Sequence, residues 1–336
     1  MSESINNARQ RNCCLDFAKG IAAIGVVLVH FPFPGVFGRT LASVGVCGVI
    51  LFFMISGYYA YDPDDAKACG KLLKRFRRNL ILTLIAVAAY LAFTVIEQLI
   101  LGTFSEWAEQ FKDPWLLPRM VILGDFEFIH GDPLWFMPAL LYSYLIFYLL
   151  HKHGITKQAY KALPFLLLLR VGMETYTNSF DADWHLSGNF LVGAMPIMLL
   201  GHFIAYKKES FTKLPLRVTF LLAGLSMITM FVFVNLKFGR FDVSQSFKIW
   251  CAFEVFIITL CLPEKKVIPA VGVIGSRYSL NIYLSHYAIG VLVLDILLLD
   301  SAPEWSTDWL LPVLVIIASL LFSMCIYKFL GNKKSA

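Results

Sequence analysis

Long apolar runs follow one another along the whole chain, and they constrain its fold more than any other feature. A helix needs roughly 20 apolar residues to cross the hydrocarbon core of a bilayer. The 336-residue chain is 58% hydrophobic and only 15% charged, which leaves room for many such runs. We count ten, at about 15–33, 42–61, 79–101, 133–150, 159–173, 187–206, 216–235, 246–262, 278–299 and 308–330. The sequence therefore predicts an all-α, polytopic integral membrane bundle.

Lysines and arginines gather on one side of this predicted bundle. With the N-terminus inside, 22 of the 29 fall in the inner loops and chain ends. Cytoplasmic loops of membrane proteins carry such an excess of cations. We therefore expect a multi-pass protein of the cell (cytoplasmic) membrane with both termini cytoplasmic. The net charge of +6 is then no sign of nucleic-acid binding, because the cations lie at the ends of the runs.

The predicted outer loops are acidic and aromatic instead. The segment 102–132 carries six carboxylates, and the segment 174–186 carries three carboxylates and a histidine. Trp135 opens the fourth apolar run on the same side. Tryptophan at a membrane edge usually anchors a helix, and stacking on a carbohydrate is the alternative. Both interpretations stay open from the sequence.

The chain shows no internal repeat, no low-complexity tract and no soluble appendage. Its seven cysteines have no metal-type spacing, so the sequence predicts no metal site. We expect a single membrane domain over residues 1–336, with its membrane core at about 15–330.

Two polar residues stand within the first apolar run. Lys19 and His30 are eleven positions apart, about three helical turns, so both side chains lie on one face of a helix. They are separated by roughly 16 Å along the helix axis. Polar groups at depth in lipid usually face a protein interior or a wet cavity. The alternative is a lysine that reaches the interface and a histidine that merely joins two helices.

A cationic cluster, KLLKRFRR, precedes the third apolar run. Lys74, Arg75 and Arg78 share one side of a helix end. Arginine matches phosphate oxygens in a bidentate way. An ordinary inner-side cluster attracted to anionic lipid is the alternative interpretation.

The later runs also hold polar residues. The motif GSRYSLNIYLSH enters the ninth run with Asn281 and ends at His286. Asparagine commonly joins membrane helices through hydrogen bonds, so His286 is the functional candidate here. Glu254 in the eighth run and Asp295 in the ninth are intramembrane carboxylates, which are candidates for ion pairing or proton handling.

Taken in order, these pieces resemble the membrane-bound acyltransferase 3 family of bacteria. The matching pieces are LDFAKGIAAIGVVLVH, GVILFFMISGYY, KRFRR, PLWFMPALL and SLNIYLSH, and the matching region covers about 11–330. The family's first span carries an arginine, ten residues and a histidine, which correspond to Lys19 and His30. The family's arginine pair before the third span corresponds to Arg75 and Arg78. Lysine keeps the charge of arginine but lacks its planar fork.

The resemblance implies an O-acyltransferase. Such an enzyme moves an acyl group, most often acetyl, from cytoplasmic acyl-CoA to a hydroxyl of a carbohydrate acceptor. The acceptor is a surface polysaccharide, a lipid-linked sugar or a similar molecule at the lipid bilayer. No permanently bound cofactor is expected, and acyl-CoA, with acetyl-CoA as the first choice, is the donor substrate.

The resemblance also assigns roles to single residues. His30 is the general base or a transient acyl carrier, and His286 polarises the thioester carbonyl or positions the acceptor. Lys19 binds an anionic group or orients Asp16, three residues before it on the same helix face. The CoA phosphates are held by Arg75, Arg78 and Lys74, with Asp16, Trp135, Asn281 and Glu254 in supporting positions.

Two other functions remain open from the sequence. The first is a ten-helix transporter or exporter of a small metabolite or lipid-linked sugar, although the two related halves common in transporters are not visible here. The second is an inactive or binding-only relative that senses a lipid or assembles a glycan complex.

Overall fold

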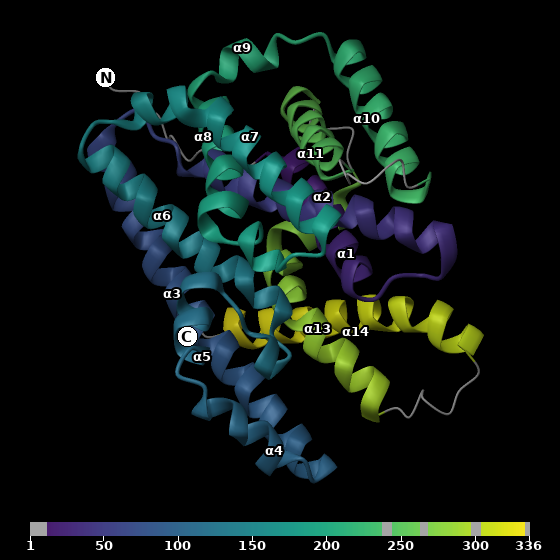
Figure 1. The fold of residues 1–336 in the computed structure, drawn as a ribbon. Coiled ribbons are helices and arrows are strands. Elements are labelled where there is room, and N and C mark those ends of the chain that lie inside the picture. Colours follow the sequence, from purple (N-terminus) through teal and green to yellow (C-terminus); the bar gives the residue numbers. More distant parts are fainter. Residues whose placement is uncertain (1–11, 237–243, 263–267, 297–303, 333–336) are drawn as a thin grey trace.

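The computed structural model describes residues 12–236, 244–262, 268–296 and 304–332, and every regular element in these ranges is helical (Figure 1). The longer helices are α1 (Cys13–His30), α2 (Gly35–Ala60), α3 (Asp65–Leu101), α6 (Phe136–Lys152), α7 (Thr156–Phe180), α8 (Met195–Tyr206), α10 (Leu216–Leu236), α11 (Ser244–Cys261), α13 (Ser279–Ile296) and α14 (Glu304–Asn332). The shorter helices are α4 (Phe104–Glu109), α5 (Leu116–Pro118), α9 (Lys208–Thr212) and α12 (Pro269–Val273). Single 3-10 or π turns are η1 (Gln110–Lys112), η2 (Arg119–Leu123), η3 (Glu127–Ile129), η4 (Asp132–Trp135), η5 (Trp184–Leu186), η6 (Phe190–Ala194) and η8 (Ile274–Tyr278).

The prediction of an all-helical membrane protein is confirmed. Within the described ranges, six helical segments are long and apolar enough to cross a membrane: Cys13–His30, Gly35–Ala60, Asp65–Leu101, Asp132–Lys152, Leu216–Val234 and Thr307–Phe329. The count of ten spans and the side of the termini stay predictions. Six of the cations that support the predicted orientation lie outside the described residues: Arg9, Arg11, Lys265, Lys266, Lys333 and Lys334. The side chain of Asp295 also lies outside them.

Helix α7 is longer than predicted. The sequence analysis ends this helix at about residue 173 and places Glu174 in an outer loop, whereas the helix continues to Phe180. The prediction was wrong because it took the charges as the end of the run. Arg170 instead pairs with Glu174 one turn later, with 2.5 Å between Nη2 and Oε1. Two paired charges can stay inside a bundle that would not hold either one alone.

Helix α3 begins earlier than the apolar run within it. The Asp64 side chain caps its N-terminus by accepting hydrogen bonds from the backbone N–H groups of Ala66 and Lys67. The bonds from Lys67 lower the pKa of the exposed Asp64 carboxyl below its ordinary value. Consequently the cationic cluster that includes Arg75 and Arg78 lies within a continuous helix, and not at its end as predicted.

Helices α1 and α2 pack at the centre of the molecule, with α3 and α6 side by side on one flank and α10 and α11 paired on the other (Figure 1). Close approach of α1 and α2 depends on glycine, because a Cβ at Gly45 would overlap the carbonyl oxygen of Gly25. Likewise, a Cβ at Gly275 of η8 would overlap the carbonyl oxygen of Asp16 on α1. Small residues let membrane helices pack in this way. Glycines thus bring α2 against α1 and η8 against the start of α1.

Candidate active site

A cavity of about 630 Å³ lies at the end of α1 that carries His30, and we call it the outer cavity. Its walls come from α1, α2, α7, α13 and the turns η3 to η5. Its charged and imidazole side chains are His30, Glu127, His130, Asp132, Arg170 and Glu174, and its large rings are Phe53, Trp135, Trp184, Tyr283 and Tyr287. Anions, a cation and aromatic faces therefore share one space. Hydroxyl-rich ligands can form hydrogen bonds with such charged groups and can stack on such rings.

A buried ion pair forms one side of the outer cavity. Arg170, only 6% exposed, pairs with Glu174 and donates a further hydrogen bond to the carbonyl oxygen of Gly193 in the π turn η6. Among the described residues, Arg170 Nε and Glu174 Oε2 have no hydrogen-bond partner although both are buried. Buried polar atoms in proteins are nearly always paired. A donor and an acceptor at one wall are thus available to a ligand.

His30 stands against a second imidazole. The ring centroids of His30 and His286 are 5.3 Å apart, and the Tyr287 ring meets His30 edge-on at 5.2 Å. The charge of the Asp132 carboxylate acts on the side chains of both His30 and Tyr287. His30 lines the outer cavity as the sequence predicts for a polar residue at depth, so its imidazole can meet a ligand.

His286 is fully buried and lines neither of the two cavities described here. Its Nδ1 lies 2.8 Å from the carbonyl oxygen of Tyr283, so Nδ1 carries the proton and donates it. Its Nε2 has no hydrogen-bond partner within the described part of the chain and keeps its lone pair. The imidazole is therefore fixed in one tautomer behind His30.

Trp135 and Trp184 flank the mouth of the outer cavity. Their ring centroids are 6.0 Å apart at a steep angle, and both line the cavity. Trp184 also donates a hydrogen bond from Nε1 to Glu127 at 3.1 Å. Both residues are thus held in place, and their faces are positioned for stacking as well as for anchoring.

A second cavity, of about 470 Å³, lies at the other end of α1, and we call it the inner cavity. Four cations line it: Lys19, Arg75, Arg78 and Arg277. No carboxylate belongs to its lining within the described ranges. The remaining polar lining comes from serines, tyrosines and asparagines, including Asn281. Such a cavity is suited to a ligand that carries several negative charges.

Lys19 is positioned by Asp16, as the sequence suggests. Its Nζ lies 3.4 Å from Asp16 Oδ1 and 5.5 Å from the centre of the Tyr59 ring. Asp16 is only 6% exposed, and its own helix presses against η8 through Gly275. The cation is thus held at the wall of the inner cavity.

Besides His286, three predicted residues line neither cavity: Asp16, which contacts Lys19, and Lys74 and Glu254. Lys74 is exposed and lines neither one, although it neighbours Arg75 in the sequence. Glu254 accepts a hydrogen bond from Ser226 at 3.0 Å and so joins α11 to α10. The structure therefore gathers Arg75 and Arg78 with Lys19, but it does not gather Lys74 or Glu254 with them.

An aromatic partition separates the two cavities. It consists of Phe52, Phe53, Phe136 and Tyr283, whose neighbouring ring centroids are 4.3 to 6.4 Å apart. Phe53 faces the outer cavity, Phe52 and Phe136 face the inner one, and Tyr283 lines both. The Tyr283 hydroxyl donates to the carbonyl oxygen of Pro133 at 2.9 Å, which fixes the ring. One side chain is therefore a wall shared by a cationic and a mixed-charge cavity.

Comparison with known families decides the class of protein. The family model that matches describes an acyltransferase domain, and it matches residues 13–328. The chain belongs to the acyltransferase 3 family. No curated relative and no solved structure matches the chain. The resemblance inferred from the motifs is thus confirmed, and membership implies a membrane acyltransferase.

In this acyltransferase, sequence reasoning missed several cavity residues. Arg170 and Glu174 are four positions apart, the spacing of an ion pair on a helix, and that signal was present in the sequence. Tyr283 and Tyr287 gave no such signal, because tyrosine is common in apolar helices near interfaces. Asp132 was read only as an outer-loop carboxylate, since sequence spacing does not show that it faces His30.

Proposed function

We propose that this acyltransferase moves an acyl group, acetyl in the simplest case, from cytoplasmic acyl-CoA to a hydroxyl of a carbohydrate acceptor. One observation carries the proposal. Helix α1 places Lys19 in a cationic cavity and His30 in a mixed-charge cavity, and Tyr283 is a wall of both. A donor and an acceptor can thus approach one reaction centre from opposite ends of the bundle.

The proposal includes an orientation. We place the ten predicted spans with both termini in the cytoplasm and the bundle in the cell membrane. The inner cavity then faces the cytoplasm, where acyl-CoA is made, and the outer cavity faces the envelope side. The excess of lysine and arginine in the predicted inner loops supports this choice.

The inner cavity is the proposed donor site. CoA carries several phosphate charges, and Arg75, Arg78, Arg277 and Lys19 supply four cations around one space. Guanidinium groups bind phosphate oxygens with paired, charge-assisted hydrogen bonds. The nucleotide end would stay near these cations while the acyl-pantetheine arm points along the helices toward the aromatic partition.

His30 is the proposed general base. The neutral imidazole accepts the proton of the acceptor hydroxyl as the hydroxyl oxygen attacks the thioester carbonyl carbon. The tetrahedral intermediate then breaks its C–S bond, and the CoA sulfur takes the proton back from the imidazolium. The products are an O-acyl ester and CoA, so atoms and charges balance. A positioned base of this kind typically contributes 10²–10⁴-fold in rate.

His286 acts on His30 in this proposal, and not on the substrate. Its burial behind His30 and its fixed tautomer suit a positioning residue. The Nε2 lone pair of His286 is available to the imidazolium that His30 becomes in the transition state. Asp132 lines the same cavity as His30 and brings negative charge to it.

The outer cavity is the proposed acceptor site. Arg170 Nε and Glu174 Oε2 offer one donor and one acceptor for sugar hydroxyls. Trp135 and Trp184 offer ring faces that pack against the apolar side of a sugar. Neither feature requires a charged acceptor, which favours a neutral carbohydrate.

The aromatic partition is the proposed crossing point. The thioester carbonyl must pass Tyr283 and Phe136 to meet a hydroxyl held near His30. Rotation of the Tyr283 ring away from the Pro133 carbonyl would join the two cavities. The partition also keeps water in the outer cavity from the thioester until the acceptor is bound.

Purified full-length protein in detergent tests the proposal directly. We would incubate it with radiolabelled acetyl-CoA and a glycan extract, and measure free CoA thiol and label in the glycan. Acceptor-dependent release of CoA with labelled ester is the expected result. Uptake of a sugar into vesicles without CoA release would identify a transporter instead, and binding of acetyl-CoA without release would identify a binding-only relative.

A further inference from the structure

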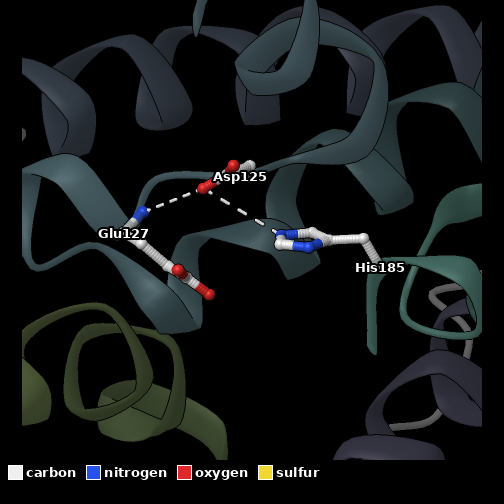
Figure 2. Close-up of side chains that lie close together, drawn as sticks. All are labelled: Asp125, Glu127 and His185. Atoms are coloured by element: carbon white, nitrogen blue, oxygen red, sulfur yellow. Dashed lines mark hydrogen bonds and ion pairs between the residues drawn. The ribbon is translucent and has the colours of Figure 1, made fainter. Parts of the chain in front are cut away.

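Three potential metal ligands from two distant segments meet beside the mouth of the outer cavity (Figure 2). Asp125 and Glu127 come from the segment that leads into η3, and His185 comes from η5. One ligand atom from each residue lies within 4.8 Å of the other two. Figure 2 shows the Asp125 carboxylate between the backbone N–H of Glu127 and the His185 imidazole, with the Glu127 carboxylate to one side of them.

The imidazole of His185 is the feature that points to a ligand. The residue is 7% exposed, and within the described ranges its Nε2 is buried without a hydrogen-bond partner. Asp183 lies 2.7 Å from its Nδ1, so Nδ1 carries the proton and the lone pair is on Nε2. That lone pair faces Asp125 Oδ1, which at 4.0 Å is too far for a hydrogen bond.

This arrangement is the one that metal-binding histidines show. A carboxylate on one ring nitrogen sets the tautomer, and the other nitrogen is left to bind the ion. The Trp184 ring stacks on His185 with centroids 4.0 Å apart and fixes the ring plane. A buried acceptor facing another acceptor is unfavourable unless a cation or proton lies between them.

Asp125 and Glu127 each have a carboxylate oxygen close to the His185 imidazole. Asp125 uses Oδ2 for Arg119, 3.4 Å away, while its Oδ1 accepts from the backbone N–H of Glu127 and turns toward His185. Glu127 uses Oε1 for the Trp184 indole and is otherwise exposed, so it can adjust. Asp125, Glu127 and Asp183 bring three negative charges against the one charge of Arg119.

We propose that Asp125, Glu127 and His185 bind one divalent transition-metal ion, Zn²⁺ or Mn²⁺. Imidazole nitrogen with two carboxylates is a donor set that suits these ions better than Mg²⁺ or Ca²⁺. Two ligands about 2.1 Å from one ion are at most about 4.2 Å apart. The 4.0 Å between Asp125 Oδ1 and His185 Nε2 lies within that limit, and the exposed Glu127 side chain can adjust to it. The sequence predicts no metal site because ligands 58 positions apart follow no spacing rule.

The ion would join two outer segments. Glu127 and Trp184 both line the outer cavity, so a bridge from η3 to η5 fixes that part of its wall. This site does not depend on the proposed acyl transfer, and it can be tested without any assay of activity.

Full-length protein in detergent, treated with a chelator and then dialysed, is titrated with Zn²⁺, Mn²⁺ and Mg²⁺. We expect about one equivalent of Zn²⁺ or Mn²⁺ and weak binding of Mg²⁺. Melting temperature should rise by about 5 °C at roughly a hundredfold excess over the Kd.

Three variants locate the ion. His185→Ala and Asp125→Asn should remove binding and the rise in melting temperature. Glu127→Gln keeps the shape and the indole hydrogen bond, and it should weaken binding about tenfold or more. Glu106→Gln, the same change on an exposed carboxylate outside the cluster, should bind as the unchanged protein does.

Several results would overturn the proposal. These are the absence of saturable Zn²⁺ or Mn²⁺ binding at millimolar concentration, and unchanged binding in Glu127→Gln. Glu127→Gln keeps this test decisive even when His185→Ala fails to fold, because Glu127 is exposed. A melting temperature that none of the three ions changes would likewise show that the cluster binds no metal.

Discussion

The two cavities of this acyltransferase share a wall but differ in charge. The inner cavity gathers four cations, and within the described residues no carboxylate lines it. The outer cavity holds a buried Arg170–Glu174 pair, further carboxylates and exposed ring faces. A space with one sign of charge selects a polyanion, whereas a space with both signs selects a neutral ligand rich in hydroxyls.

This difference separates two explanations of the cations. Positive charge on the inner side of a membrane protein is expected from topology alone. Topology does not explain why Arg75 and Arg78 line a cavity while Lys74 and Arg77 are exposed outside it. Nor does it explain why Arg170, only 6% exposed, lines the outer cavity. Both cavities therefore have features that a merely structural membrane bundle would not need.

The largest effect is expected at the outer cavity, from loss of the base. His30→Ala should lower acyl transfer by about 10²–10⁴-fold, because the acceptor hydroxyl then loses its proposed general base. Rates are measured by CoA release, with abundance and melting temperature recorded for both proteins. His153→Ala removes an exposed histidine that lines neither cavity and should leave the rate unchanged.

Comparing the unchanged protein with His30→Ala also distinguishes the two roles of His30, general base and transient acyl carrier. After rapid denaturation in the cold at neutral pH without acceptor, label on the unchanged chain that is absent from His30→Ala would show a transient acyl-histidine. Its absence from both would leave His30 as the base. Full activity of His30→Ala would remove the residue from the chemistry altogether.

The next effect concerns the buried pair. Arg170→Leu leaves Glu174 as an unpaired charge and should lower the free energy of unfolding by about 3–5 kcal/mol. The double change Arg170→Leu with Glu174→Leu removes both charges and should recover most of that loss. Thermal unfolding in detergent measures both variants.

The double variant also tests whether Arg170 and Glu174 bind the acceptor. If Arg170 and Glu174 bind acceptor hydroxyls, the recovered protein still has a raised KM for the glycan and an unchanged KM for acyl-CoA. A double variant with the original acceptor KM would make the pair purely structural, and the contrast between the cavities would then depend on the rings alone.

The sequence predicts the helices and charged residues that form the two cavities better than it predicts how these parts are arranged. Long apolar runs need helices, and the period of a helix alone places Lys19 and His30 on one face. What the period does not give is which helices lie opposite that face. Tyr283 becomes a shared wall only because α13 packs against α1 and η4, and this packing follows from three-dimensional contacts such as the bond to Pro133.

Charges caused the clearest error. The end of α7 was placed too early because Arg170 and Glu174 looked like a boundary in an apolar run. Inside a bundle the two charges neutralise each other, so the helix continues to Phe180. Lys74 shows the opposite case. It belongs to the same motif as Arg75 and lies one turn before Arg78, yet it is exposed and does not line the cavity.

The difference between Lys74 and its neighbour Arg75 suggests a test of whether the inner cavity binds acyl-CoA. Arg75→Ala with Arg78→Ala should raise the KM for acyl-CoA by about 10–100-fold. This corresponds to the roughly 1.5–3 kcal/mol of one full-strength charge-assisted hydrogen bond, because water weakens the bonds of these two partly exposed side chains. The effect should shrink at high ionic strength, because salt screens exposed charges. Arg77→Ala is the matched control, with the same charge in the same motif but outside the cavity. Equal KM values for the two variants would return the cluster to a topological role.

The smallest effect is expected at Lys19, where the sequence departs from the family's arginine. Lys19→Arg keeps the charge beside Asp16, so activity should stay within about threefold. Lys19→Met has a similar length but no charge, and it leaves the buried Asp16 carboxylate without the ammonium 3.4 Å away. That variant should lose about tenfold or more in activity. If Arg and Met behave alike at this position, Lys19 only fills space and three cations define the inner cavity. If Met alone fails and acyl-CoA KM rises with it, the cation belongs to the donor site; if kcat falls instead, it acts through the start of α1 on the helix that positions His30.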